Sequence, residues 1–166
     1  PPVMLINTVS PRRFATFATV FSIVSWPPWF SVRVGAPVGT QVPVLAVETQ
    51  GADSLGQSVA AGQRVELPAI TSIATSLGAK AVCENAFAVT QNHDVRCLAV
   101  SDQQALQACE DFLRDHRLLV EPACGAALAA LYSAEPSVTA EFNAPLVIVC
   151  GGATASLEQI RAWRQA

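Results

Sequence analysis

The sequence predicts an α/β fold built on a mostly parallel sheet flanked by helices. Short apolar runs of strand character alternate along the chain with segments of helical spacing. This alternation is typical of parallel sheets whose strands are connected through helices. The 166 residues suffice for one domain, and 51% of them are hydrophobic while 14% are charged. A disordered chain is therefore excluded.

The first 40 residues differ from the rest, and we expect them to form an irregular lead. Arg12 and Arg13 precede an apolar run, 14–26, which two prolines follow. A charged start before an apolar run resembles a secretory signal, but this run is shorter than the roughly 20 residues that span a bilayer. We predict a non-homologous lead at 1–40. A targeting or membrane role and a spurious translation are the alternatives.

The expected elements of the remaining chain follow from its periodicity. Strands are expected where apolar residues run without a break, and helices where apolar residues recur every three or four positions. The expected extended segments are 43–47, 81–82, 96–100, 118–120 and 145–149. The expected helices are 53–61, 70–77, 84–91, the segment after Ser101, 123–132 and 156–165.

Capping residues indicate where several of these helices begin and end. A side-chain oxygen at the N-cap accepts a hydrogen bond from a free backbone N–H, and glycine ends a helix in the left-handed conformation. The expected starts are Asp53, Ser101 with Gln104, Pro122, and Ser156 with Gln159, and the expected ends are Gly62 and Gly78.

Charge and cysteine content exclude several classes of function. A net charge of −3 gives no reason to expect nucleic acid or an anionic membrane as a partner. The five cysteines are widely spaced and form no C-x-x-C pair, which disfavours a zinc site and a disulfide framework. Reduced thiols of this kind are typical of a cytoplasmic protein. Phosphate-loop, dinucleotide-binding, G-x-S-x-G and H-E-x-x-H motifs are absent from the sequence.

Residues 147–156 are the candidate site that spacing alone indicates. An apolar strand ends in Cys150, Gly151 and Gly152 follow, and a helix begins next. Ligands of open α/β sheets bind beyond the carboxyl ends of strands, so the Cys150 thiol could face a ligand. The alternative is that Cys150 is a small buried apolar residue.

Three charged residues are further candidates whose roles spacing alone does not determine. Glu48 and Glu121 each follow an apolar run, so each could be a ligand, a base or a solvated strand end. Lys80, the single lysine of the chain, follows an expected helix end and is expected at the surface.

Four stretches resemble the L-serine dehydratases, which are pyridoxal-phosphate (PLP) enzymes of the tryptophan synthase β fold type. Residues 120–128 (VEPACGAAL) and 147–152 (VIVCGG) resemble two of the family's motifs. Residues 44–52 are similar to its AVET-x-GA, and 67–80 to its LP-x-ITS-x-A…LG-x-K. The matches run in family order from about Gln41 to the end. They favour the liver-type serine dehydratases over the cysteine synthases.

The resemblance implies a partial fold-type-II enzyme and its reaction. The family reaction is a PLP-dependent β-elimination that converts L-serine to pyruvate and ammonia, or L-threonine to 2-oxobutanoate and ammonia. The family's Schiff-base lysine and glycine-rich phosphate loop have no counterpart in 1–40, and Lys80 matches an ordinary family position. Residues 41–166 therefore resemble the C-terminal part of the domain, and we expect this chain to be inactive by itself. The alternative is a non-catalytic fragment or pseudo-subunit that binds a full-length dehydratase.

The resemblance also implies roles for individual residues. Cys150 matches the residue that faces the pyridine nitrogen of PLP, and Gly151 and Gly152 would let the backbone pass close to the ring. The family forms homodimers and binds a monovalent cation such as potassium through oxygen ligands. The residues that match the cation ligands are Glu48, Ala52, Ser54, Leu77 and Ala79.

Overall fold

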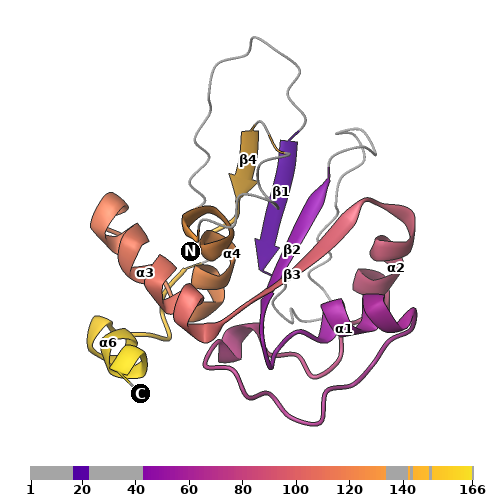
Figure 1. Cartoon of the computed structure of the whole chain (residues 1–166), viewed down its shortest axis with the longest axis horizontal. Helices are drawn as coiled ribbons and strands as arrows, with labels where there is room; N and C mark the ends of the chain where they lie inside the picture. The colour runs from indigo at the N-terminus through magenta and orange to yellow at the C-terminus, as the bar shows by residue number, and fades with distance from the viewer. Residues whose placement is uncertain (1–16, 23–42, 134–141, 143, 150, 166) are drawn as a thin grey trace.

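The computed structural model describes residues 17–22, 43–133, 142, 144–149 and 151–165, and it confirms the predicted α/β fold. Its sheet has the strand order β3-β2-β1-β4, and every neighbouring pair is parallel (Figure 1). The strands are β1 (Phe17–Ser22), β2 (Val44–Thr49), β3 (Val95–Val100) and β4 (Ala144–Val147). The helices are α1 (Ser54–Ala61), the 3-10 turn η1 (Thr75–Leu77), α2 (Glu84–Asn92), α3 (Asp102–His116), α4 (Pro122–Tyr132) and α6 (Leu157–Gln165).

Helices cover both faces of the sheet. In Figure 1, α1 and α2 lie on one side of the strands, while α4 lies on the other side with α3 and α6 outside it. All six residues of β2 are buried, as expected of a parallel strand that is covered on both faces. Leu45 and Val47 pack into the core on the α3 and α4 side. Ala46 packs with Leu55 and Val82 on the α1 side.

Strand β1 was not predicted from the sequence. It falls inside the expected lead, yet it lies between β2 and β4, with Thr19 opposite Val44 and Phe17 opposite Ala144. An apolar strand of a parallel sheet and the apolar part of a secretory signal can have the same composition. Periodicity alone therefore could not separate the two readings of this run.

The small residues of α4 allow it to pack closely against α3. A β-carbon on Gly125 would lie 2.2 Å from the carbonyl oxygen of Ala105 and 2.5 Å from the Cys109 sulfur. The backbones of the two helices can approach this closely only because position 125 has no side chain. Burial raises the pKa of the Cys109 thiol to about 12, so this sulfur acts as a neutral packing group.

Three of the four expected helix starts are confirmed. The Ser101 hydroxyl accepts the N–H of Gln104 at 3.2 Å, and the Gln104 side chain accepts the N–H of Ser101 at 2.8 Å. Pro122 is the first residue of α4. The Ser156 hydroxyl accepts the N–H of Gln159 at 3.2 Å.

Two expected elements of the segment 67–82 are wrong. Of the helix predicted at 70–77, only the turn η1 forms, and residues 81–82 are not in a strand. Hydrogen bonds between residues far apart in the segment take the place of a helical pattern. For example, the N–H of Leu67 donates to the Lys80 carbonyl at 2.8 Å. Residues 134–141 and 143, for which no helix or strand was expected, lie outside the described residues.

Other boundaries move by a few residues. Strand β4 ends at Val147 rather than at 149, and α2 extends to Asn92 rather than ending at 91. In the parts of the chain that the structure describes, we find no helix with the length and apolar character needed to cross a membrane.

Candidate functional site

Glu48 is the last residue but one of the buried strand β2, and its carboxylate points at the start of α1. Its two oxygens accept the backbone N–H groups of Leu55 at 3.0 Å and of Gly56 at 2.8 Å. These N–H groups belong to the first turn of α1, where the helix has unsatisfied donors and a partial positive charge. Asp53, the expected cap, makes no side-chain capping bond. The prediction for Asp53 is therefore wrong, because a carboxylate from the neighbouring strand occupies the capping position.

Burial disfavours the ionised form of the Glu48 carboxyl group. Only 4% of this residue is exposed, and burial raises the pKa of its carboxyl above the ordinary value. The hydrogen bonds from Leu55 and Gly56 act in the opposite direction without offsetting burial, and the nearby Asp53 charge adds to the rise. A buried carboxylate in this state gains from a cation placed beside it.

Two further predicted cation ligands follow Glu48 in the chain. Gly51 adopts a φ of 86°, a conformation that favours glycine, and turns the chain after β2. Ala52 is buried in this turn, and its N–H donates to the carbonyl of Thr49 at 2.8 Å. Ser54 is the buried first residue of α1. The structure thus brings Glu48, Ala52 and Ser54 to the carboxyl end of β2.

The remaining predicted ligands, Leu77 and Ala79, lie on the loop that follows α1. Leu77 is buried, and its carbonyl accepts the N–H of Ala79 at 3.0 Å. The same loop is bonded to the β2 end, because the N–H of Thr71 donates to the Gly51 carbonyl at 3.1 Å. A carboxylate and backbone carbonyls, which are hard oxygen donors, suit a hard ion such as potassium. The described residues contain no cluster of three or more His, Cys, Asp or Glu side chains that could hold a metal ion.

A buried chain of polar groups at this end was missed by the sequence analysis. The hydroxyls of Thr49 and Ser72 lie 2.8 Å apart, and Ser72 donates to the carboxylate of Asp102 at 2.6 Å. These residues come from β2, the following loop and the first turn of α3. No local signal could have revealed the chain, because each partner is separated from the next by 20 residues or more.

The glycine turn beyond β4 packs against the start of α4. A β-carbon on Gly152 would lie 2.4 Å from the carbonyl oxygen of Leu119 and 2.8 Å from the α-carbon of Val120. Gly151 has a φ of 146°, and a β-carbon there would meet no atom of the described residues within 4 Å. One glycine therefore permits a close backbone contact, while the other has no such neighbour among the described residues. Cys150, which precedes them, lies outside the described residues.

Hydrogen bonds join this turn to the VEPAC stretch. The N–H of Gly151 donates to the Cys124 sulfur at 3.2 Å, and its carbonyl accepts the N–H of Glu121 at 3.1 Å. Two of the stretches that the sequence analysis singled out, separated in the chain, are thus direct neighbours in space.

Comparison with known proteins identifies the family. The model of the family described as pyridoxal-phosphate dependent enzyme matches residues 31–151. The chain belongs to this family.

Several relatives of this PLP-dependent family are similar over most of the chain. Human L-serine dehydratase/L-threonine deaminase is 45% identical over 131 residues, which are 75% of this chain and 40% of the relative. The mouse protein named serine dehydratase-like is 45% identical over 132 residues, with the same coverage. The chain therefore spans about 40% of the length of these relatives. The resemblance to serine dehydratases is confirmed.

Solved structures of the family support the same fold. An L-serine ammonia-lyase from the fungus Rhizomucor miehei superposes with a TM-score of 0.74 and 29% identity, covering 91% of this chain and 50% of that one. Maize serine racemase gives a TM-score of 0.72 and 25% identity, covering 92% of this chain and 48% of that one. The prediction of a fold-type-II PLP enzyme is confirmed.

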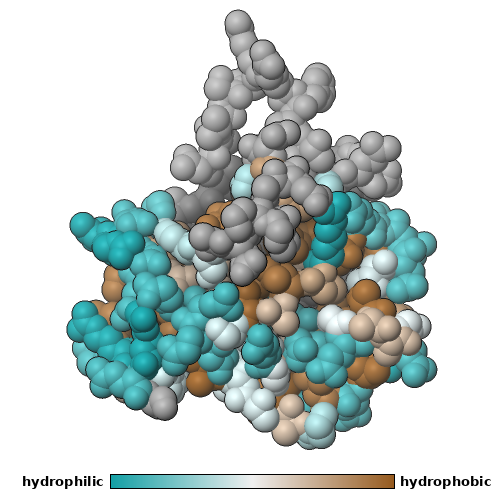
Figure 2. Space-filling model, viewed as in Figure 1, coloured by the Kyte–Doolittle hydropathy of each residue, from teal (hydrophilic) through white to brown (hydrophobic). Residues whose placement is uncertain are grey.

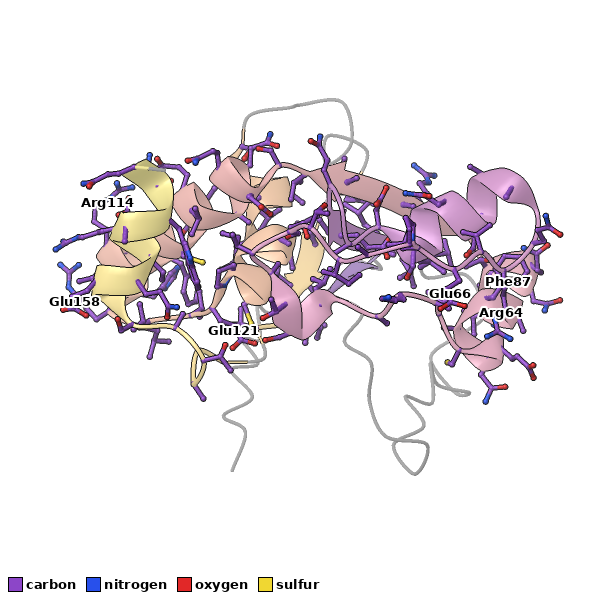
Figure 3. All side chains as sticks on the ribbon, turned by 90° about the horizontal axis from the view of Figure 1, so that it is seen from below. Arg64, Glu66, Phe87, Arg114, Glu121 and Glu158 are labelled. Carbon is purple, nitrogen blue, oxygen red and sulfur yellow. The ribbon has the colours of Figure 1, made fainter. Side chains whose placement is uncertain are left out.

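The structure gives Glu121 and Lys80 supporting positions in this PLP-enzyme fold. Glu121 stands at the N-cap of α4 but makes no side-chain capping bond there. Glu121 is labelled in Figure 3. Its carboxylate accepts the Thr154 hydroxyl, which holds the segment after the glycine turn. Lys80 is exposed, as predicted, and its Nζ donates to the Pro68 carbonyl at 3.1 Å.

Proposed function

We propose that this chain forms the C-terminal part of a PLP-dependent L-serine/L-threonine dehydratase. The reaction would convert L-serine to pyruvate and ammonia, or L-threonine to 2-oxobutanoate and ammonia. The observation that carries the proposal is the bonded pair of the VEPAC stretch and the glycine turn. Both stretches resemble motifs of the serine dehydratases. The human relative, which is 45% identical, is named L-serine dehydratase/L-threonine deaminase.

The glycine turn fits a flat cofactor ring. Among the described residues, no atom lies within 4 Å of a β-carbon placed on Gly151, and glycine would leave this side of the backbone free for the ring. When bound, PLP supplies the electron sink that a β-elimination requires. Gly151 and Gly152 would lie along its ring, and Cys150 would offer the ring nitrogen a thiol, which is a weak donor. A weak donor leaves that nitrogen unprotonated.

A potassium ion would be held at the carboxyl end of β2. We propose Glu48, Ala52, Ser54, Leu77 and Ala79 as its ligands. Glu48 would supply the one carboxylate, and backbone carbonyls would supply further oxygen ligands. The raised pKa of Glu48 supports the proposal, because a cation beside this buried group would stabilise its ionised form. The ion would join the end of β2 to the loop that carries Leu77.

The covalent anchor of the cofactor would come from outside these 166 residues. Lys80 is the single lysine in them, and its Nζ binds the Pro68 carbonyl at the surface. The proposed division of labour is that residues 41–166 position the ring and the cation, while another segment supplies the lysine. The chain by itself is then expected to be inactive.

A full-length chimera tests this function. Residues 41–166 replace the corresponding region of human L-serine dehydratase/L-threonine deaminase, and pyruvate is assayed with L-serine and PLP. We expect the chimera to form pyruvate, because its two parts together supply the anchor, the ring contact and the cation site. The 166-residue chain in the same assay is the control and is expected to form none. A folded chimera that binds PLP but forms no pyruvate would contradict the proposal, as would turnover by the chain alone.

Pairing with another subunit is the second candidate. Leu118, Leu131 and Leu146 are large apolar residues with 39–43% of their surface exposed, and apolar residues are visible on the face drawn in Figure 2. We propose that these leucines contribute to a contact with a homodimer partner or with an intact dehydratase subunit. Co-purification with a tagged full-length dehydratase tests the pairing, and a lone monomer in that experiment counts against it.

We also propose that the protein works in the cytoplasm. Cys83, Cys97 and Cys109 carry free thiols among the described residues. Thiols that remain unpaired are usual in a reducing compartment.

A further inference from the structure

Ser72 is the centre of the buried polar chain at the end of β2. Its Oγ donates to the Asp102 carboxylate at 2.6 Å and accepts the N–H of Ala74 at 3.0 Å. Since the one proton of Ser72 is directed to Asp102, the contact of 2.8 Å with Thr49 requires the Thr49 hydroxyl to be the donor. The chain therefore runs in one direction, from Thr49 through Ser72 to Asp102.

Asp102 holds the loop through two adjacent points. Besides the Ser72 hydroxyl, its carboxylate accepts the N–H of Ile73 at 3.1 Å. Asp102 is the first residue of α3, where the helix dipole favours a negative charge. Because α3 packs its buried face into the main core, the loop is bonded to a rigid element.

Burial makes this arrangement hard to replace. Thr49 is fully buried and only 6% of Ser72 is exposed. A buried hydroxyl that loses its partner keeps its full desolvation cost, so neither the Thr49 nor the Ser72 hydroxyl can move away without loss of stability.

The polar chain connects the two segments that carry the proposed cation ligands. Thr49 directly follows Glu48 in β2, and Ala74 directly precedes the turn η1, which ends at Leu77. A displacement of Ser72 would be transmitted along this short turn to the Leu77 carbonyl and to Ala79 beyond it.

We propose that Asp102 is a positioning residue for the cation site, acting through Ser72 and Ile73 to hold the carbonyls of Leu77 and Ala79. This proposal rests on the potassium site of the proposed function. It assigns Asp102 no contact with the ion. Residues that orient metal ligands without touching the metal typically change metal affinity when they are replaced.

The test measures how potassium changes the melting temperature of the 166-residue chain. Melting is followed in potassium chloride titrations, with lithium chloride keeping the ionic strength constant. We expect potassium to raise the melting temperature of the wild type. In Asp102→Asn we expect the half-saturating potassium concentration to rise about tenfold or more. Ser72→Ala removes the central hydroxyl instead and is expected to show the same rise, so it serves if Asp102→Asn fails to fold.

Asp111→Asn is the matched control. It removes the same charge from the same helix, where Asp111 pairs with Arg114 at 2.9 Å, and its potassium response is expected to equal that of the wild type. An unchanged half-saturating concentration in Asp102→Asn or Ser72→Ala would overturn the positioning role. A wild type that does not respond to potassium would overturn the cation site and this inference with it. Failure of the dehydratase proposal is read separately, from pyruvate formation by the chimera.

Discussion

Replacing Glu48 by alanine is expected to lower the free energy of unfolding by about 3 kcal/mol. The substitution removes the acceptor of two backbone N–H groups, those of Leu55 and Gly56, and each buried donor left unpaired costs about 1–3 kcal/mol. Relief of the buried charge offsets part of this loss, because burial raises the pKa of Glu48. Urea unfolding of the variant and the wild type measures the difference.

Asp53→Ala is the matched control for this prediction. Asp53 stands at the N-cap position of the same helix, but its side chain binds only the exposed amide of Gln57, at 3.1 Å. Its removal is expected to cost less than about 0.5 kcal/mol. If Asp53→Ala costs as much as Glu48→Ala, then Asp53 caps α1 and the assignment of Glu48 is wrong. Glu48→Ala is also expected to abolish the rise in melting temperature with potassium.

Gly125→Ala is expected to destabilise the chain by about 3 kcal/mol. The new β-carbon would lie 2.2 Å from the Ala105 carbonyl oxygen and 2.5 Å from the Cys109 sulfur. The first of these is a backbone atom, so α3 and α4 must move apart to relieve the overlap. Separation of these helices opens the main core, because both contribute buried side chains to it. Thermal unfolding of the variant measures the loss.

Gly56→Ala is the corresponding control in another helix. There the added β-carbon would lie 3.3 Å from a Glu48 carboxylate oxygen and 3.7 Å from the Cys97 β-carbon. The helix propensity of alanine exceeds that of glycine by about 1 kcal/mol, and we expect this gain to offset the slight crowding. Equal losses at Gly125 and Gly56 would show that helical glycines are sensitive in general, and would contradict the specific contact between α3 and α4.

Features that depend on neighbours in sequence could be predicted from the sequence. The capping box of Ser101 and Gln104 involves residues three positions apart, and its two bonds form as expected. Gly62 ends α1 in the left-handed conformation, as the glycine after an apolar run indicated. The apolar runs of β2 and β3 also became strands near their expected bounds.

Features that depend on distant partners could not be predicted. The helix expected at 70–77 is largely replaced by a loop because Thr71 bonds to Gly51 and Ile73 bonds to Asp102. Strand β1 acquires its identity from its parallel neighbours, and an apolar run carries no sign of which neighbours it will have. Asp53 was the expected cap, but Glu48 reaches the helix from the adjacent strand.

In the candidate site too, contacts between distant residues could not be predicted from the sequence. Spacing alone indicated a ligand at Cys150 and left Glu48 open between several roles, and the resemblance to serine dehydratases supplied the ring and cation assignments. The structure adds that Glu48 is buried against a helix N-terminus and that Ser72 and Asp102 hold the loop opposite. These contacts join segments far apart in the sequence, so no motif contains them.

Thallium(I), which replaces potassium and scatters X-rays anomalously, tests the central claim most directly. Crystals of the 166-residue chain are grown with thallium acetate in place of potassium, and an anomalous difference map is calculated. We predict a peak in contact with the Glu48 carboxylate, with Ser54, and with the backbone carbonyls of Ala52, Leu77 and Ala79. A well-ordered β2 end without a peak, or a thallium ion bound only at other residues, would contradict the account.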